Sequence, residues 1–126
     1  MAALAALGFA AGRAGAGPGR HWADWNGDDW RALAPEAQVA YVDGFLAGAG
    51  LTQAAGRLAV ADSAGLRDTL DALRRSGRFR FPYGGNVYVS RLSDYYWWEN
   101  HRPLPTWFAL WEVNASLIGP TSEPAR

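Results

Sequence analysis

The sequence feature that most constrains the fold is the spacing of the apolar residues, which recur every three or four positions along most of the chain. This spacing places apolar side chains on one face of an α-helix. The segment 34–50 shows the pattern most clearly, in Val39, Tyr41, Val42, Phe45 and Leu46. Pro35 suits the first turn of this helix, and we expect Gly48 and Gly50 to end it, although the Ala-rich stretch 51–62 leaves a helical continuation through 54–60 open.

Helix starts and stops can be recognised elsewhere in the chain. The Asn-Gly-Asp-Asp turn at 26–29 can accept the unpaired N–H groups of a helix that follows it. A serine caps the segment 64–75, and a proline precedes the segment 106–118. The segment 87–98 is a further helix candidate, although its β-branched and aromatic residues leave a strand at 86–90 as an alternative.

The whole pattern contains no internal repeat and no series of strands. It predicts an all-α protein, a small bundle of about four helices with a short extended connector at 78–81. We expect a single helical domain over residues 21–119, preceded by a signal-like or flexible Ala/Gly leader over residues 1–20. Residues 120–126 are expected to form a polar tail.

The leader suggests where the protein works. Its apolar run, residues 1–11, is too short for a bilayer, which takes about 20 apolar residues to span. The run does match the apolar core of a signal peptide, and Ala14-Gly15-Ala16 offers a pattern that signal peptidase accepts. We therefore expect a periplasmic or secreted protein whose mature chain begins near Gly17.

Charge excludes one class of partner and leaves another open. The 12 basic and 12 acidic residues cancel, whereas proteins that bind nucleic acids need a basic surplus for the phosphates. The charges are nevertheless unevenly placed, since residues 24–43 hold five acids and one Arg while residues 67–80 hold five Arg and two Asp. Such asymmetry can orient a protein partner or a second copy, unless the two segments neutralise one another within the fold.

The aromatic residues are the main functional signal. The chain contains 7 Trp, 5 Tyr and 5 Phe, and four of these rings are consecutive at 95–98. Consecutive residues on a helix turn by about 100° each, so the four rings cannot all face one core. The rings that fit a core stripe are Tyr41, Phe45, Tyr96 and Trp111.

The remaining tryptophans are our candidate partner-binding residues. Trp is a residue type that dominates binding hot spots, because it buries a large rigid area and keeps a polar atom. The candidate surface, with two arginines at its rim, consists of Trp22, Trp25, Trp97, Trp98, Trp107, Arg78 and Arg80. The alternative is that these tryptophans form the core of a Trp-rich domain.

Catalysis has one weaker candidate, the loop Glu99-Asn100-His101-Arg102. A carboxylate and an imidazole could transfer a proton there, and Arg102 could hold an oxyanion. No other motif completes a nucleophile, base and orienting group, so we expect no catalytic residue. The alternative function is a small carbohydrate-binding or hydrolase domain that uses exposed Trp rings with Glu99 and His101.

Metal and cofactor sites are not expected. The chain has no Cys, and its two histidines, His21 and His101, lie far apart in the sequence. They therefore lack the helical spacing that places two imidazoles on one ion. We predict neither a metal nor a cofactor.

Several packing motifs follow one another over residues 30–118. They are Trp30 and Leu33, the run Tyr41-Val42-Asp43-Gly44-Phe45-Leu46-Ala47-Gly48, Leu92, Tyr95-Tyr96, Asn100, Leu104-Pro105, Ala109-Leu110 and Val113. In this order the chain resembles a group of small exported bacterial all-helical proteins of unknown function. It is more distantly similar to periplasmic immunity proteins that neutralise peptidoglycan amidase toxins. The resemblance implies an all-α, exported, non-enzymatic domain.

The predicted function is therefore a non-enzymatic exported module that binds another protein. The module could be immunity-like, or it could be an accessory subunit of an envelope or membrane-associated complex. Two alternatives remain open, peripheral membrane association and a homo-oligomer that seals the aromatic rings between copies. No nucleic acid is expected among the partners.

Overall fold

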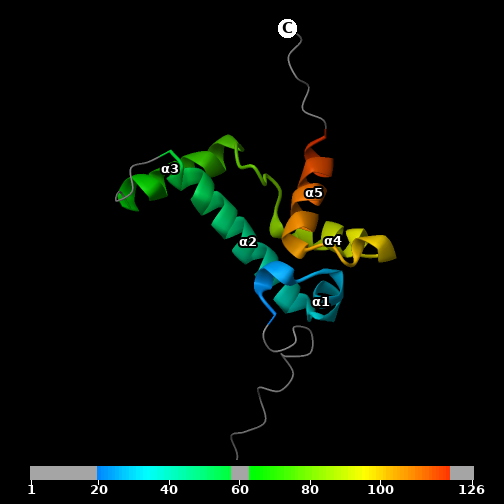
Figure 1. The fold of residues 1–126 in the computed structure, drawn as a ribbon. Helices are drawn as coiled ribbons and strands as arrows, with labels where there is room; N and C mark the ends of the chain where they lie inside the picture. Colours follow the sequence, from blue (N-terminus) through cyan, green and yellow to red (C-terminus); the bar gives the residue numbers. More distant parts are fainter. Residues whose placement is uncertain (1–19, 58–62, 120–126) are drawn as a thin grey trace, which may run out of the picture. The chain divides into compact units, whose positions relative to one another are not determined.

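A computed structural model describes residues 20–57 and 63–119. These residues contain α-helices and short 3-10 turns but no strand, which confirms the all-α prediction (Figure 1). The elements in chain order are η1 (Trp22–Asp24), α1 (Gly27–Ala32), α2 (Pro35–Ala55), α3 (Ser63–Ser76), α4 (Gly85–Tyr95), η2 (Glu99–His101) and α5 (Thr106–Ile118). The predicted tail and all but the last residue of the predicted leader lie outside the described residues.

The described residues form two compact units. The terminal unit contains residues 20–35 and 91–119, and the central unit contains residues 36–57 and 63–90. The single domain expected over residues 21–119 stays a prediction. Among the described residues, no helix combines the length and the apolar character that crossing a bilayer requires.

The core of the terminal unit is formed by buried side chains of α1, of α4 with the residue after it, and of α5, namely Trp30, Leu92, Tyr96, Ala109, Leu110 and Val113. The two large rings also have partners for their polar atoms. Trp30 Nε1 donates to Ser93 Oγ at 3.3 Å, and the Tyr96 hydroxyl donates to the Leu104 carbonyl at 2.9 Å. These bonds remove the cost of burying an unpaired indole N–H or hydroxyl.

Two segments that are distant in sequence are joined at the start of α1. The Gly27 N–H donates to the Arg102 carbonyl at 2.9 Å, and the Thr106 N–H donates to the Trp25 carbonyl at 2.7 Å. Gly27 has no space for a side chain, because an added Cβ would lie 2.4 Å from Tyr96 Cδ1 and 2.9 Å from Arg102 Cα. The glycine is therefore required by packing.

The start of α1 is capped as the sequence predicts. Asn26 Oδ1 accepts the N–H groups of Asp28 at 3.0 Å and Asp29 at 3.4 Å, and Asp29 Oδ2 accepts the Asn26 N–H at 2.9 Å. This reciprocal arrangement is a capping box. The Asp29 side chain is only 4% exposed and forms an ion pair with Arg20 at 3.0 Å. The cap therefore holds residue 20 against the terminal unit.

In the central unit, α2 is longer than expected, because Gly48 and Gly50 do not end it. The helix continues to Ala55. An added Cβ on Gly50 would lie 3.1 Å from Phe79 Cε1, so the bare backbone lets the Phe79 ring pack closely against α2. A helical glycine costs about 1 kcal/mol relative to alanine, and this packing offsets the cost.

The core of the central unit combines buried residues of α2, α3 and α4, namely Val42, Ala54, Leu73 and Tyr88. Phe81 links α2 to α4, since its ring packs edge-on against Phe45 at 5.0 Å and against Tyr88 at 5.9 Å between centroids. The Tyr88 hydroxyl accepts the Tyr83 N–H at 3.4 Å. Burial raises the pKa of Tyr88, so its hydroxyl stays protonated at neutral pH.

Helix α4 differs from the expectation at both ends. Residues 86–90 are helical, so the alternative strand is wrong, and the helix ends at Tyr95 instead of continuing to Trp98. The Tyr96 N–H still donates to the Leu92 carbonyl, but the Trp97 N–H turns to the Asp94 carbonyl. This tightening places Trp97 and Trp98 beyond the helix. The four consecutive rings are therefore not on one helix.

Candidate functional site

Exposed tryptophans concentrate in the terminal unit. The exposed fractions are 78% for Trp97, 63% for Trp98, 62% for Trp22, 58% for Trp111 and 43% for Trp107. The first three and Trp107 belong to the surface predicted from the sequence. Trp25, also predicted for that surface, is half-buried, and its carbonyl accepts hydrogen bonds from the N–H and the hydroxyl of Thr106.

The sequence interpretation that placed the Trp111 ring in the core is wrong, because the structure leaves this residue exposed. The buried face of α5 carries Leu110, Val113 and Asn114. Trp111 follows Leu110 by one residue and is turned about 100° away from it around the helix. The ring therefore lies on the outer side of α5. Helix α5 carries apolar residues on several faces, and the face that is buried depends on which other elements pack against it.

The α5 aromatic face is defined here as Trp107, Phe108, Trp111 and Ile118. The Phe108 ring stacks on Trp111 with centroids 6.1 Å apart, and Trp107 packs edge-on against Phe108 at 6.0 Å. Ile118 continues the face at the end of the helix and is exposed. The face is thus a contiguous aromatic cluster followed by an aliphatic side chain, all on one helix.

Trp107 connects this face to η1. Its indole Nε1 donates to the Ala23 carbonyl at 3.1 Å, which fixes the ring against the turn that carries Trp22. The exposed ring of Trp22 lies 5.2 Å from the His21 ring. The structure therefore brings η1 and α5 together, although 84 positions separate Ala23 from Trp107.

Trp97 and Trp98 form a separate part of the terminal unit. Both follow α4, and the Trp98 carbonyl accepts the His101 N–H at 3.1 Å, which begins η2. Neither indole makes a ring contact or a side-chain hydrogen bond among the described residues. Both rings are therefore largely exposed and are held by no hydrogen bond or ring contact among the described residues.

The two predicted rim arginines lie in the central unit, on the connector between α3 and α4. Gln53 of α2 holds this connector with both ends of its side-chain amide. Its Nε2 donates to the Arg78 carbonyl at 2.7 Å, and its Oε1 accepts the Arg80 N–H at 2.9 Å. The side chains of both arginines are exposed. Their role at the rim of a binding surface stays a prediction.

The acid–base candidates Glu99 and His101 are the first and last residues of η2 and have different surroundings. The Glu99 side chain is 88% exposed, and its carboxylate lies 3.9 Å from Arg102. His101 Nδ1 lies 2.9 Å from the Tyr95 carbonyl. A carbonyl only accepts hydrogen bonds, so Nδ1 carries the hydrogen and the neutral ring keeps Nε2 as its acceptor. The imidazole stacks on the Tyr95 ring, with centroids 4.1 Å apart.

A second carboxylate, Glu112, lies in this region and was missed by sequence reasoning. The Tyr95 hydroxyl donates a hydrogen bond to it. Burial, this hydrogen bond and the charge of Glu112 raise the pKa of Tyr95 well above its usual value, so the phenol stays a donor at neutral pH. Tyr95 and Glu112 lie 17 positions apart on α4 and α5, and no local pattern pairs them.

No family model, no curated protein and no solved structure matches this chain. The described residues also contain no group of three or more His, Asp or Glu side chains arranged to hold a metal ion.

Proposed function

We propose that this protein is a non-enzymatic binding module that contacts another protein through the α5 aromatic face. The supporting observation is that Trp107 and Trp111 are exposed on one side of α5, while the other side carries the buried residues Leu110, Val113 and Asn114. Contiguous exposed apolar surface on a folded domain marks sites of association. Trp is also the residue type most enriched among interface hot spots.

The rings of this face are held in position before any partner arrives. Trp107 is tied to Ala23 through its indole nitrogen, and Phe108 lies between the two tryptophans. A partner would therefore immobilise few free side chains, each of which costs about 0.5–1.5 kcal/mol on association. Preorganisation of this kind favours tight binding from a small area.

Trp111 contributes most to this proposal. Its indole makes no hydrogen bond among the described residues, so the N–H is available to an acceptor on a partner. Burial of a large apolar side chain contributes about 1.5–3 kcal/mol, and Trp111 is more exposed than Trp107. We therefore place Trp111 at the centre of the interface.

We further propose that the module works in the periplasm or as a secreted protein. The signal-like leader and the sequence resemblance support this location. On that basis the partner is a secreted toxin that the module neutralises, or an envelope complex to which it belongs. Binding to a membrane surface and self-association are outcomes that the experiment below distinguishes.

Site-specific photo-crosslinking tests the proposal. A photoreactive amino acid at Ala115 lies one turn from Trp111 on the same side of α5 and leaves both tryptophans in place. Irradiation in cells is expected to give one defined product that contains a second polypeptide. The product is expected to disappear in the Trp111→Ala variant. The matched control carries the photoreactive residue at Ala72, an exposed position on α3.

Several outcomes would overturn the proposal. They include no product from position 115, the same product from position 72, and a product that persists in Trp111→Ala. A product made of two copies of this chain would identify a homo-oligomer instead, and a lipid adduct would identify a membrane surface. As a control, the free energy of unfolding is measured for Trp111→Ala and for the unaltered protein. Equal values show that loss of the product is not caused by a folding defect.

A further inference from the structure

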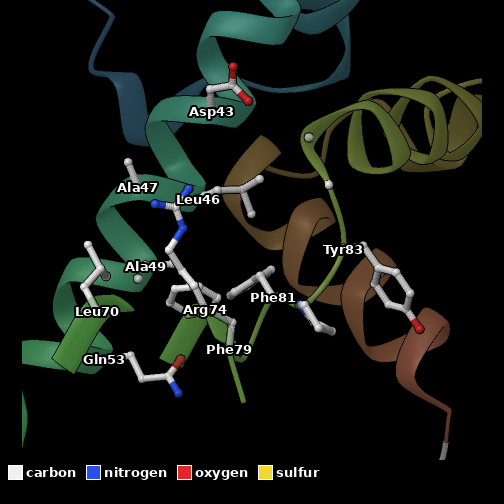
Figure 2. A pocket seen from close by; sticks show the side chains of 14 residues that line it. Asp43, Leu46, Ala47, Ala49, Gln53, Leu70, Arg74, Phe79, Phe81 and Tyr83 are labelled. Atoms are coloured by element: carbon white, nitrogen blue, oxygen red, sulfur yellow. The ribbon is translucent and has the colours of Figure 1, made fainter. Parts of the chain in front are cut away.

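A pocket of about 460 Å³ lies in the central unit, between α2, α3 and the connector that precedes α4 (Figure 2). Pockets that bind small molecules typically measure about 300–1,000 Å³ and have mainly apolar walls. The walls here are largely apolar and are formed by Leu46, Ala49, Leu70, Phe79, Phe81 and Pro82. Every residue that lines the pocket belongs to the central unit.

The connector wall of the pocket is fixed before any ligand enters. Phe79 packs against the bare backbone of Gly50, and Phe81 packs edge-on against Phe45. Gln53 holds the connector backbone through two hydrogen bonds, at Arg78 and Arg80. A segment without helix or strand therefore keeps a defined position, which lowers the entropy cost of binding.

Two charged residues line the pocket, and their surroundings differ. Asp43 lies against the start of α4, since its Oδ1 would be 2.5 Å from a Cβ added to Gly85. The positive end of the α4 dipole offsets this carboxylate. Arg74 extends along the pocket toward Leu46 and Ala47, as Figure 2 shows. Its guanidinium has no ion pair or hydrogen bond among the described residues.

The guanidinium of Arg74, an exposed residue, is therefore a cation at the pocket that has no ion-pair or hydrogen-bond partner in the part of the chain that the structure describes. The negative end of the α3 dipole favours a cation in the last helical turn, where Arg74 lies. The dipole does not supply acceptors for the five N–H groups of the side chain. A carboxylate supplies two oxygens that match the guanidinium fork.

We propose that the pocket binds a small amphiphilic carboxylate. Its apolar body lies among Leu46, Leu70 and Phe79, and its carboxylate pairs with Arg74. The charge of the guanidinium and the apolar walls together select this class over a neutral or cationic amphiphile of the same length. The site lies in the central unit, so it does not depend on the α5 aromatic face.

Titration of the full chain with sodium octanoate tests this site. We expect saturable binding of one octanoate per chain by calorimetry. In the heteronuclear NMR spectrum, the amides of Gly50 and Gly85 and the side-chain amide of Gln53 should shift, whereas Gly27 should not. 1-Octanol and octylammonium have the same chain without the anion, and both are expected to bind at least tenfold more weakly.

Two arginine variants distinguish an effect of the Arg74 charge on binding from a general effect on folding. Arg74→Gln is expected to weaken octanoate binding about tenfold and to leave 1-octanol binding unchanged, as loss of one charged hydrogen-bonded pair implies. Arg75→Gln removes the next charge on α3, which does not line the pocket, and should bind octanoate like the unaltered protein. The proposal would be overturned by non-saturable shifts, by equal affinity for octanoate and 1-octanol, or by equal loss in both variants.

Discussion

The terminal and central units are stabilised in different ways. In the terminal unit, buried rings make directed hydrogen bonds, such as those of Trp30 to Ser93 and Tyr96 to Leu104. In the central unit, the half-buried rings of Phe45 and Phe81 pack edge-on beside a pocket. A single side chain, Gln53, hydrogen-bonds to the connector backbone. The terminal unit thus depends on close fit, whereas the central unit keeps open space that a ligand can use.

Individual glycines of the two units also differ in the space around their Cα atoms. An added Cβ at Gly27 of the terminal unit would meet an aromatic ring and a backbone carbon below 3 Å. An added Cβ at Gly44 or Gly48 of the central unit would meet nothing within 4 Å. The same substitution should therefore have opposite effects at Gly27 and at Gly48.

Gly27→Ala is expected to have the largest effect. The new Cβ collides with Tyr96 and with the Arg102 backbone, and overpacking of this severity should cost about 3 kcal/mol of unfolding free energy. Urea unfolding followed by Trp fluorescence measures this, because all seven tryptophans lie in the terminal unit. A loss below about 0.5 kcal/mol, which is typical of a neutral surface change, would contradict the close fit at this position.

Asp29→Ala is expected to have the next largest effect. It removes the reciprocal bond of the capping box and leaves Arg20 without its ion-pair partner, so we expect a loss of about 2 kcal/mol. Asp28→Ala is the matched control, since Asp28 is exposed and only its backbone N–H takes part in the cap. Equal losses in the two variants in chemical denaturation would show that the buried carboxylate has no special role.

Gln53→Ala should have a moderate effect on the central unit. It removes both hydrogen bonds to the connector, for a loss of about 1 kcal/mol, and the Arg80 amide should exchange faster with deuterium. Thr52→Ala is the control, because the Thr52 hydroxyl bonds only to the Gly48 carbonyl of its own helix. Unchanged exchange at Arg80 in Gln53→Ala would show that the connector is held by other contacts.

Gly48→Ala should have the smallest effect and the opposite sign. Alanine favours the helix over glycine by about 0.5–1 kcal/mol, and the new methyl group meets no atom. Thermal unfolding followed by circular dichroism should show a raised midpoint. Gly50→Ala is the matched comparison, because its methyl group would lie 3.1 Å from Phe79 and should cancel the gain. A lowered midpoint for Gly48→Ala would contradict the finding that an added methyl group at this position meets no other atom.

The helix starts could be predicted from the sequence because their causes are local. Asn26 and Asp29 form the cap of α1 within one turn, and the proline before α5 acts at the position next to the helix. The continuation of α2 through Gly50 could not be decided from the sequence, since Phe79 packs against Gly50 from 29 positions away. Local propensity is weak, and packing of this kind overrides it.

The candidate sites likewise differ in whether they arise from local sequence signals or from contacts between distant segments. The exposure of Trp97 and Trp98 was expected from the crowding of four consecutive rings on one helix, but its cause in the structure is that the helix ends at Tyr95. Trp111 was misplaced because α5 carries apolar residues on several faces, and only its tertiary contacts select one. The Tyr95 and Glu112 pair, the Gln53 contacts and the Arg74 pocket each join distant segments, for which spacing gives no signal.

The chain connectivity of the two units has a consequence for how the protein is made. Contacts of the central unit, such as Gln53 with Arg80, close within the continuous stretch 36–90. Contacts of the terminal unit, such as Gly27 with Arg102, join the two ends of the described chain. A ribosome completes the first set before the second exists, and domains generally fold as their residues emerge. During synthesis, Trp30 therefore stays without its buried surroundings until α5 is made, which makes the terminal unit the last part of the protein to close.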